Sequence, residues 1–448
     1  MDDSVPPTKL FSCLSSAADV VKEHDMVYIF SHHDADGISA AVILAKAMMR
    51  AGKEFKVTLF GALNDENFDI IKKCGARCII IADMGASYIK GLDSIDADVV
   101  VLDHHKSDGV AERIHYINPH SFGIDGMSSG CGASMAMLFA LQMSEENWDL
   151  VQVAFAGIIG DKQNSTGLKG INRYLFDEGN RRGYITKEDG SLIPSGELMH
   201  SLYHSTHPYI RGVSGNADGV AELLNTARID VTRSSSELSD VERRRLSSVI
   251  AARLLEQNVS LATLDEISST RYALRNWNTD ASTLASLFDS CGRSGAGGVG
   301  IGLGLGDRAC MESAARSMDE TSERTLAAVK ELDSKGLEKM DNIQFFDSSA
   351  SGFTGVLCEI AMRYICDPDK PVVGCNSSDG RSKASSRCTH AILEKGVDLS
   401  VAMKAAGEAA GGSGGGHRIA SGAWFPSGNE KKFLEALDRI IGEQISAK

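Results

Sequence analysis

The stretch "MVYIFSHHDADG", residues 26–37, joins an apolar run to a dense group of ionisable side chains. The apolar part predicts a buried strand over residues 26–31. Directly after it come His32, His33, Asp34 and Asp36. Carboxylates that lie side by side near a core repel each other, so this crowding requires a positive partner. A metal ion, an arginine or a proton could supply that charge.

Three further apolar runs in the first 160 residues predict strands, at 56–61, 78–83 and 98–103. Between the first two strands, residues 38–52 are rich in alanine and end at Gly52, which predicts a helix with a glycine stop. Short apolar strands that alternate with helices predict an α/β domain whose parallel sheet is covered on both faces.

The composition is that of a globular protein, with 43% hydrophobic and 24% charged residues among 448. No apolar run approaches the roughly 20 residues that span a bilayer, and the acidic start does not resemble a secretory signal. We therefore expect a cytoplasmic protein with no membrane partner, whose ten scattered cysteines are reduced. The net charge of −14 excludes a broadly basic surface, so any nucleic acid must bind through a local groove and bound cations.

The pattern changes twice along the chain, which predicts three parts: residues 1–175, 176–335 and 336–448. From about residue 145 to 335 strand patterns are lacking, and a capping box from Ser239 to Glu242 opens one of several helices. Strand patterns return in the last part, at 342–349, 371–378, 382–387 and 417–426. We expect a mostly helical middle section followed by a second, smaller α/β domain.

Four polar clusters lie where predicted elements of the first part end. They are His32 with Asp34 and Asp36; Asp83; Asp103 with His104 and His105; and Asp161 after a helix. The carboxyl ends of parallel strands converge on one crevice, so we expect these side chains to meet there. Imidazoles with several carboxylates and no thiolate suit Mn²⁺ or Mg²⁺ better than a structural zinc. So many acidic groups suit a pair of ions about 3.5–4 Å apart.

The motifs "HHDADG", "IIIADMG", "VVVLDHH" and "IIGD" resemble, in this order, those of the DHH phosphoesterase superfamily. That superfamily includes RecJ-type nucleases, short-oligonucleotide phosphodiesterases and family II inorganic pyrophosphatases. The resemblance implies one Mn²⁺ held by His32, Asp34 and Asp83, and a second held by Asp36, Asp83, His104 and Asp161, with Asp83 bridging. It further implies that His105 faces the scissile phosphate and that Asp103 orients the histidines, whereas His33 occupies a variable position outside the ligand set.

The stretch "GGSGGGHRIASGAW", residues 411–424, is rich in glycines, which allow close backbone approach to an anion. Together with "GRSKASSR", residues 380–387, it resembles the DHHA1 domain, in which a "GGGH" loop and a nearby "SxR" strand bind the phosphate and sugar of the substrate. The resemblance implies substrate binding by Ser385, Arg387, Gly414, Gly415, Gly416 and His417. It also implies an active site in the cleft between the two α/β domains.

A DHH domain followed by a DHHA1 domain favours hydrolysis of a nucleic-acid phosphodiester over hydrolysis of pyrophosphate. The long middle section resembles that of archaeal RecJ-like proteins, including nucleases that associate with the GINS replication complex. The leading hypothesis is a Mn²⁺-dependent exonuclease for single-stranded DNA, or also RNA, in replication or repair. One alternative is a phosphodiesterase for nanoRNA or cyclic dinucleotides, and another is a scaffold that binds GINS and the replicative helicase.

Other residues keep two interpretations at this point. His204, His207, Arg211 and Arg293 could line the path of a nucleic-acid strand or serve the fold. Trp424 and Phe425 could stack on bases or pack in a core. The glycine series at 295–306 looks like a dinucleotide fingerprint but follows no clear strand, which disfavours that interpretation.

Overall fold

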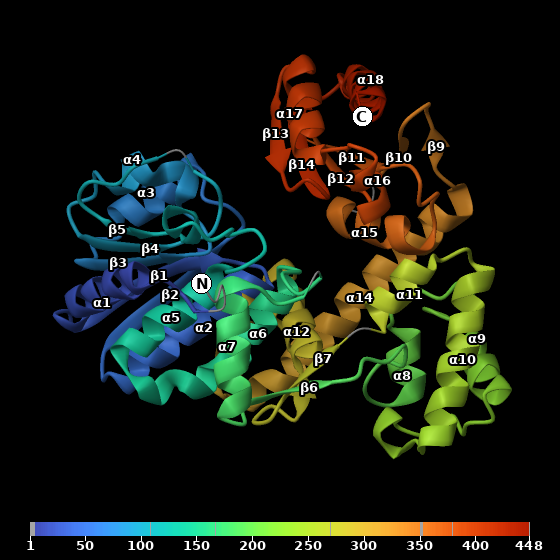
Figure 1. Ribbon diagram of the computed structural model, residues 1–448, viewed down its shortest axis with the longest axis horizontal. Helices are drawn as coiled ribbons and strands as arrows, with labels where there is room; N and C mark the ends of the chain where they lie inside the picture. Colours follow the sequence, from blue (N-terminus) through green and yellow to red (C-terminus); the bar gives the residue numbers. More distant parts are fainter. Residues whose placement is uncertain are drawn as a thin grey trace. The chain divides into compact units, whose positions relative to one another are not determined.

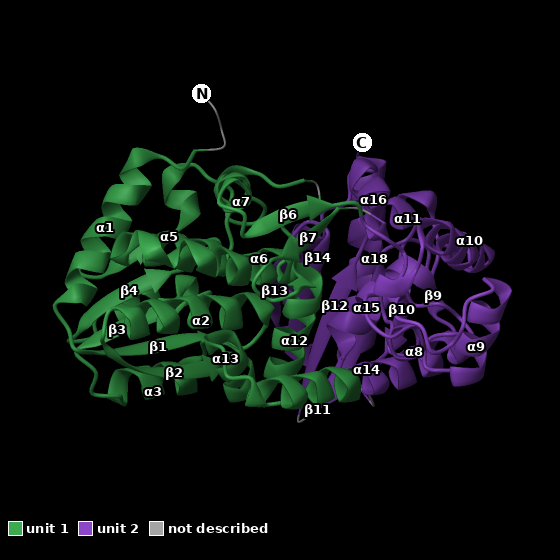
Figure 2. Ribbon diagram, turned by 90° about the horizontal axis from the view of Figure 1, so that it is seen from below, with its two compact units in different colours: residues 1–189, 270–321 green, residues 190–269, 322–448 purple. Residues whose placement is uncertain are grey.

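The computed structural model describes residues 5–107, 109–165, 167–268, 270–349, 353–378 and 380–447. The chain forms two compact units (Figure 2). Unit 1 comprises residues 1–189 and 270–321, and unit 2 comprises residues 190–269 and 322–448. The stretch between the two α/β regions thus contributes residues to both units.

A five-stranded sheet forms the centre of unit 1, with the order β2-β1-β3-β4-β5 (Figure 1). Its strands are β1 (Met26–His32), β2 (Glu54–Phe60), β3 (Cys78–Ala82), β4 (Asp98–Leu102) and β5 (His115–Ile117). Every pairing between neighbours is parallel, which confirms the predicted parallel sheet. The order reverses beside β1, because β2 lies on one side of it and β3 on the other, and such a switch point is where open α/β sheets bind ligands.

Helices cover both faces of this sheet (Figure 1). Alternate residues of β3 point to opposite faces: Ile80 packs in one core, and Ile79 and Ile81 pack in another. The larger core holds α1 (Thr8–Lys22), α2 (Ala35–Arg50), α5 (Gly132–Met143) and α6 (Val151–Gly160). The smaller core holds α3 (Asp65–Lys73) and α4 (Ile89–Leu92). Burial on both faces explains why the central strands are continuous apolar runs.

Unit 1 also contains a small antiparallel sheet that the sequence did not predict. It consists of β6 (Ile185–Glu188), β7 (Arg271–Leu274) and β8 (Thr279–Asp280). The strands are short, and β6 pairs with a segment more than 80 residues away, so no local pattern marks them. The remaining helices of this region are α7 (Gly170–Arg181), α12 (Ala281–Arg293), α13 (Gly297–Leu305) and α14 (Ala309–Lys335), which begins in unit 1 and ends in unit 2.

The glycine series at 295–306 forms α13, which follows a helix and packs on α2. A Cβ atom added to Gly304 would lie 2.3 Å from Cγ2 of the buried Val42. The glycines therefore allow two helices to approach closely, and the dinucleotide interpretation is wrong.

Unit 2 combines a helical part with a six-stranded sheet of order β13-β14-β12-β11-β10-β9. The strands are β9 (Glu338–Lys339), β10 (Gln344–Asp347), β11 (Val372–Ser378), β12 (Arg381–Arg387), β13 (Ser413–Gly416) and β14 (Ala420–Pro426). The predicted glycine loop is thus an edge strand, β13, paired with β14. A second small α/β domain in the last part of the chain is confirmed.

Helices α15 (Thr354–Tyr364), α16 (His390–Glu394), α17 (Leu399–Ala409) and α18 (Glu430–Ser446) accompany this sheet. The helical part holds α8 (Leu198–Tyr203), α9 (Ala217–Thr226), α10 (Asp240–Glu256) and α11 (Leu261–Ile267). The predicted capping box opens α10, where the backbone N–H of Ser239 donates to Glu242 Oε2 over 2.9 Å. In the described part of the chain no helix is both long and apolar enough to cross a bilayer. All ten cysteines, which lie in that part, are free thiols.

Two alanine substitutions in α13 should move stability in opposite directions. Gly304→Ala forces a methyl group against Val42, so we expect a loss of about 1–3 kcal/mol in the free energy of unfolding. Among the described residues no atom lies within 4 Å of a Cβ added to Gly298, so Gly298→Ala should gain up to about 1 kcal/mol from helix propensity. Urea unfolding followed by circular dichroism measures both changes. Equal stability of the two variants would contradict the close packing of α13 on α2.

Candidate metal centre

Acidic and imidazole side chains meet at the carboxyl edge of the unit 1 sheet. His32 is the last residue of β1, Asp83 follows β3, and His104 follows β4 by two residues. These strands are consecutive neighbours in the sheet, so their ends present the side chains to the same space. Asp36 in the first turn of α2 and Asp161 at the end of α6 join them. The structure thus brings the predicted ligand residues together.

The first cluster consists of His32, Asp34 and Asp83, whose ligand atoms lie within 4.8 Å of one another. His32 Nδ1 lies 2.9 Å from Asp34 Oδ2 and 3.6 Å from Asp83 Oδ2. The other ring nitrogen, Nε2, donates to the carbonyl of Gly61 over 3.0 Å. This bond fixes the ring so that Nδ1 faces the carboxylates, as is typical of a metal-binding histidine.

The second cluster consists of Asp36, His104 and Asp161. His104 Nδ1 donates to the carbonyl of Gly126 over 2.7 Å, which leaves Nε2 to face the carboxylates. That atom lies 3.2 Å from Asp83 Oδ1 and 3.9 Å from Asp36 Oδ2. Asp83 therefore directs one oxygen to each cluster, which is the arrangement of a carboxylate that bridges two ions.

The backbone of Asp83 is in the left-handed region, with φ of 56°. This conformation is costly for residues other than glycine, although aspartate tolerates it better than most. It turns the chain out of β3 while the N–H of Asp83 still donates to the carbonyl of Leu102 over 2.9 Å. Such strain is often found at functional positions.

The N-terminus of α5 holds Asp36 in place. Its backbone N–H groups at Gly132 and Ala133 donate to Asp36 Oδ2 and Oδ1 over 2.7 and 2.9 Å. The helix dipole adds a favourable interaction with this buried carboxylate. A Cβ on Gly132 would lie 2.5 Å from Asp83 Cβ, and one on Gly157 would lie 2.6 Å from Asp36 Oδ1. The site therefore requires glycine at both positions.

Charge is unevenly distributed over the centre. Burial and the neighbouring carboxylates of Asp83 and Asp161 raise the pKa of Asp36 well above its usual value. Burial also raises the pKa of Asp161, to about 6. Burial lowers the pKa of His32, but its contact with Asp34 and the negative charges of Asp34 and Asp83 prevail and raise that pKa to about 11. Positive charge on the imidazoles thus compensates the carboxylates, and metal ions at the same place would do so without protons.

Asp103 acts on the histidines and lies outside both clusters. Its Oδ2 accepts from the N–H of Ala86 over 2.7 Å, and its Oδ1 accepts from His104 N over 2.7 Å and from His105 Nδ1 over 2.8 Å. Burial opposes ionisation of Asp103, but the bond from His105 outweighs it and lowers the pKa of this carboxyl. The side chain of His105 is 52% exposed, so its ring is accessible beside the centre.

A chain of hydrogen bonds from Asp161 through Gln163 and Asn172 was not predicted from the sequence. Gln163 Nε2 donates both to Asp161 Oδ2 and to the carbonyl of Gly126, each over 2.8 Å. Its Oε1 accepts from Asn172 Nδ2 over 2.6 Å, and Asn172 Oδ1 accepts from the hydroxyl of Ser134 over 2.5 Å. Gln163 thus fixes a carboxylate and the carbonyl that orients His104. Only its place two residues after "IIGD" could have indicated this role.

The residues proposed for substrate binding lie on the sheet of unit 2. Gly415 pairs with Gly422, and Gly422 pairs with Ser385, so these residues form one row across three strands. Residues directly opposite each other in an antiparallel pair share a face, and so do residues two apart in a strand. Arg381, Lys383 and Arg387 therefore lie on the same face as Ser385, and alternate residues of β12 are buried on the other.

The structure separates the two aromatic candidates. Phe425 is fully buried and stacks on Phe433 with ring centroids 4.5 Å apart, so it belongs to the core. Trp424 is 46% exposed, and the guanidinium of Arg381 lies 5.3 Å from its ring centroid. His417 follows β13 directly, with its N–H donating to the carbonyl of Ala420.

Two arginines predicted as candidates for a strand path are engaged in ion pairs. Arg211 forms two hydrogen bonds with Asp333, of 2.7 and 2.6 Å, and Arg293 bonds to Asp289 one turn away. The ring of His207 packs against that of Tyr364 in a tilted arrangement, with centroids 5.8 Å apart. These contacts favour the interpretation in which the residues serve the fold.

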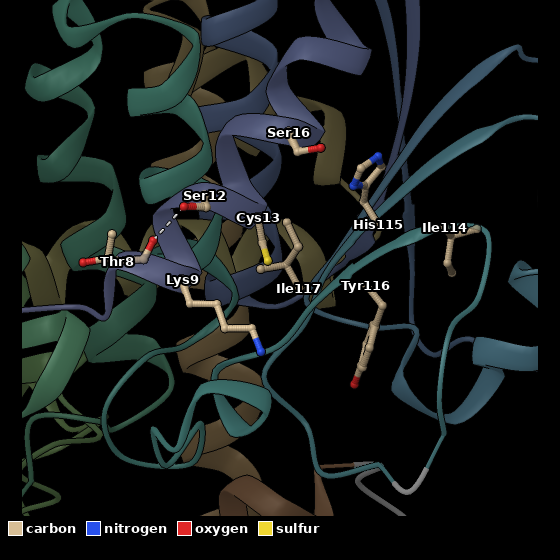
Figure 3. Close-up of a pocket in the computed structure, with 9 residues that line it drawn as sticks. All are labelled: Thr8, Lys9, Ser12, Cys13, Ser16, Ile114, His115, Tyr116 and Ile117. Atoms are coloured by element: carbon tan, nitrogen blue, oxygen red, sulfur yellow. Dashed lines mark hydrogen bonds between the residues drawn. The ribbon is translucent and has the colours of Figure 1, made fainter.

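A pocket of about 620 Å³ opens elsewhere in unit 1, between α1 and β5 (Figure 3). Lys9, Cys13 and His115 are among the residues that line it. The strand ends of β1, β3 and β4 do not contribute to its wall, so it is separate from the metal centre.

Removal of the Gln163 side chain should weaken metal binding without touching a ligand. We expect Gln163→Leu to lower the affinity for Mn²⁺ by about 10- to 100-fold, because Asp161 and His104 lose their orientation. Isothermal titration calorimetry measures the change. Gln142→Leu is the matched control. Gln142 lies near the C-terminal end of α5, away from the Gly132 end that contacts Asp36, so this variant should keep the affinity. An unchanged affinity in Gln163→Leu would refute this role.

Metal binding should release protons at neutral pH. A ligand imidazole must be neutral, whereas the raised pKa of His32, about 11, keeps it protonated in the metal-free protein. The pKa of His104 is raised as well, so the apparent affinity for Mn²⁺ should rise with pH from 6 to 8. Calorimetric titrations in buffers of different ionisation enthalpy count the protons released. A binding enthalpy that does not depend on the buffer would contradict this expectation.

Two family domains match the chain. Residues 26–159 match the N-terminal domain of the DHH family, and residues 346–443 match the DHHA1 domain. An uncharacterised protein of Methanocaldococcus jannaschii is 29% identical over 435 residues, which is 95% of each chain. The first match contains β1, β3 and β4 with their polar ends, and the second contains the sheet face with Ser385 and Arg387.

Solved structures share the fold at low sequence identity. RecJ of Thermus thermophilus in complex with Mn²⁺ matches with a TM-score of 0.62 and 15% identity, over 98% of this chain and 55% of that chain. The chain thus spans about half the length of that RecJ. CDC45 of Entamoeba histolytica matches with a TM-score of 0.60 and 11% identity, over 97% and 98% of the two chains. The chain therefore contains an N-terminal domain of the DHH family and a DHHA1 domain, which together cover more than half of it.

Proposed function

We propose that this protein is a two-metal exonuclease that hydrolyses phosphodiester bonds of single-stranded DNA or RNA. The observation that carries the proposal is the placement of Asp83, whose Oδ2 faces His32 and whose Oδ1 faces His104. Such a carboxylate is suited to hold two dications at the short separation that phosphoryl transfer uses.

His32, Asp34 and Asp83 would hold one Mn²⁺, and Asp36, Asp83, His104 and Asp161 would hold the other. The donor set fits the ions: each imidazole presents one nitrogen inward, and every other donor is a carboxylate oxygen. When bound, such a pair supplies an activated water and neutralises charge on the phosphoryl group. Mg²⁺ accepts the same oxygen ligands but suits imidazole less well, which favours Mn²⁺.

His105 is the residue placed to act on the substrate itself. Its ring is fixed by the bond from Nδ1 to Asp103, which leaves Nε2 as the other ring nitrogen, and the side chain is 52% exposed. Burial lowers the pKa of His105, but the bond to Asp103 prevails and raises it. This shift favours the protonated ring, which would donate from Nε2 to a phosphate oxygen. Asp103 serves as the residue that positions it.

One face of the unit 2 sheet, exposed at Arg381 and Lys383 and half-buried at Ser385 and Arg387, explains how an acidic protein would hold a polyanion. Arg381, Lys383 and Arg387 place three cations along one strand, and Ser385 adds a hydroxyl. No described atom lies within 4 Å of a Cβ built on Gly415, so a phosphate can approach the backbone there. Gly414, Gly416 and His417 would complete this phosphate-binding surface. Phosphate contacts of this kind give affinity that falls with salt.

Trp424 of β14 pairs with Lys383 and so lies on the same face of the sheet. It favours nucleic acid over an inorganic substrate, because an exposed ring can stack on any base. A phosphodiesterase for nanoRNA or cyclic dinucleotides is the second candidate, since the same residues would serve a short substrate. A scaffold that binds GINS and the replicative helicase is the third, and the CDC45-like fold favours it. A complete set of ligand residues argues that any such scaffold is also an enzyme.

Asp83→Asn should reduce hydrolysis to background, because neither ion keeps its shared ligand. The assay uses single-stranded DNA and RNA, labelled at the 5′ or the 3′ end in turn, with Mn²⁺ and separation of products on a gel. Asp69→Asn on the exposed surface of α3 is the control and should keep full activity. A ladder from one end supports an exonuclease, whereas rates that fall beyond about five nucleotides support the short-substrate enzyme. Full activity of Asp83→Asn would refute the two-metal proposal.

Arg387→Ala should weaken substrate binding more than chemistry. We expect KM for a long single strand to rise severalfold while kcat changes little, and the salt dependence of KM to become shallower. Arg439→Ala on the exposed part of α18 is the matched control, since its cation pairs with Glu443 one turn away. A severalfold fall of kcat with no change in KM would contradict a binding role for this face.

A further inference from the structure

The segment 203–215 is fastened to the second half of α14 within unit 2. The hydroxyl of Ser322 donates to the carbonyl of His204, and Lys330 Nζ donates to the carbonyl of Gly215. Arg211 pairs with Asp333 further along the helix. Leu198 and Leu202 of α8 pack in the same core as Leu326 and Val329 of α14. Polar and apolar contacts therefore fix α8 against this part of α14.

Two histidines lie at one end of this contact between α8 and α14. His200 in α8 and His204 at its C-terminal end are four residues apart, so they share a face of the helix. Their ring centroids are 4.3 Å apart, and their nearest ligand nitrogens lie within 4.8 Å. Glu323 of α14 faces the same place, with Oε1 3.6 Å from His204 Nε2.

The hydrogen bonds of His204 leave one nitrogen available as a ligand. Its Nδ1 donates to the carbonyl of His200 over 3.0 Å, which fixes the tautomer and leaves a lone pair on Nε2. Among the described residues Nε2 is buried and has no hydrogen-bond partner. The 3.6 Å to Glu323 is too long for a hydrogen bond. It is close to the roughly 3.4 Å that separates two donors about 2.1 Å from a tetrahedral ion.

We propose that His200, His204 and Glu323 form a structural Zn²⁺ site in unit 2 that links α8 to α14. Two imidazoles and one carboxylate suit Zn²⁺, whereas the carboxylate-rich centre of unit 1 suits Mn²⁺. The side chain of Glu323 is 58% exposed, so solvent reaches the site from that side and would supply the fourth ligand. The ion would add a metal cross-link to the polar and apolar contacts that already join α8 to α14.

The test removes the centre of unit 1 first, because His32 and His104 would also bind Zn²⁺. The full chain carrying Asp83→Asn is stripped with a chelator, titrated with Zn²⁺ by calorimetry, and heated with and without Zn²⁺. We expect one high-affinity equivalent of Zn²⁺ and a higher melting temperature. Adding His204→Gln should abolish both effects, and adding Glu323→Gln should weaken the affinity at least tenfold.

A matched control excludes binding by surface histidines. His390 is exposed in unit 2, so Asp83→Asn with His390→Gln should bind Zn²⁺ as Asp83→Asn does. His200→Gln, at an exposed position, serves as a second variant if His204→Gln fails to fold. Absence of high-affinity Zn²⁺ in Asp83→Asn would overturn the proposal. Retention of that binding in the folded histidine variants would overturn it equally, since an ion pair or the cysteines would then explain the data.

Discussion

Electrostatic repulsion among carboxylates at one sheet edge is the constraint on which unit 1 depends. Asp36 and Asp83 are almost completely buried, and Asp161 lies beside them. Buried like charges are tolerated only where positive charge or hydrogen-bond donors compensate them. The fold supplies both: two N–H groups of α5 bind Asp36, and imidazoles flank Asp83. The glycines at 132 and 157 are the steric condition for this arrangement, because larger residues would displace the carboxylates.

The meeting of the proposed ligand residues at one sheet edge was predictable because the sheet is parallel. Each polar cluster follows an apolar run, and parallel strands bring their carboxyl ends together whatever the loops do. Their orientations were not predictable. Asp83 divides its oxygens between two clusters because of a left-handed backbone that no sequence pattern marks. Asp36 meets Gly132 across 96 residues, and Gln163 meets the carbonyl of Gly126 across 37, so these contacts exist only in the folded chain.

In unit 2, too, the sequence pattern predicts part of the structure and the rest depends on contacts between distant residues. Alternation along β14 decides that Phe425 is core and that Trp424 is exposed, but only the observed pairing reveals which phase of the alternation faces inward. The glycine stretch was expected to be a loop because it resembles the "GGGH" loop of the DHHA1 domain. It pairs as an edge strand because β14 offers it a partner, and its exposed backbone becomes part of the surface proposed for phosphate. The short sheet of β6, β7 and β8 was missed because its strands carry too few residues for a pattern.

The two units differ in how their charged residues would act on an anionic substrate. With a net charge of −14, the protein as a whole repels a polyanion, and the carboxylates of unit 1 add to that repulsion where the chemistry is proposed. The basic face of β12 provides attraction only locally, through residues at alternate positions of one strand. Dications at the sheet edge would therefore have an electrostatic role before any bond is broken, because they change the sign of the field that an approaching phosphate meets. Substrate binding and catalysis should then depend on the same ions, whereas the fold, held by its own hydrogen bonds and imidazoles, should not.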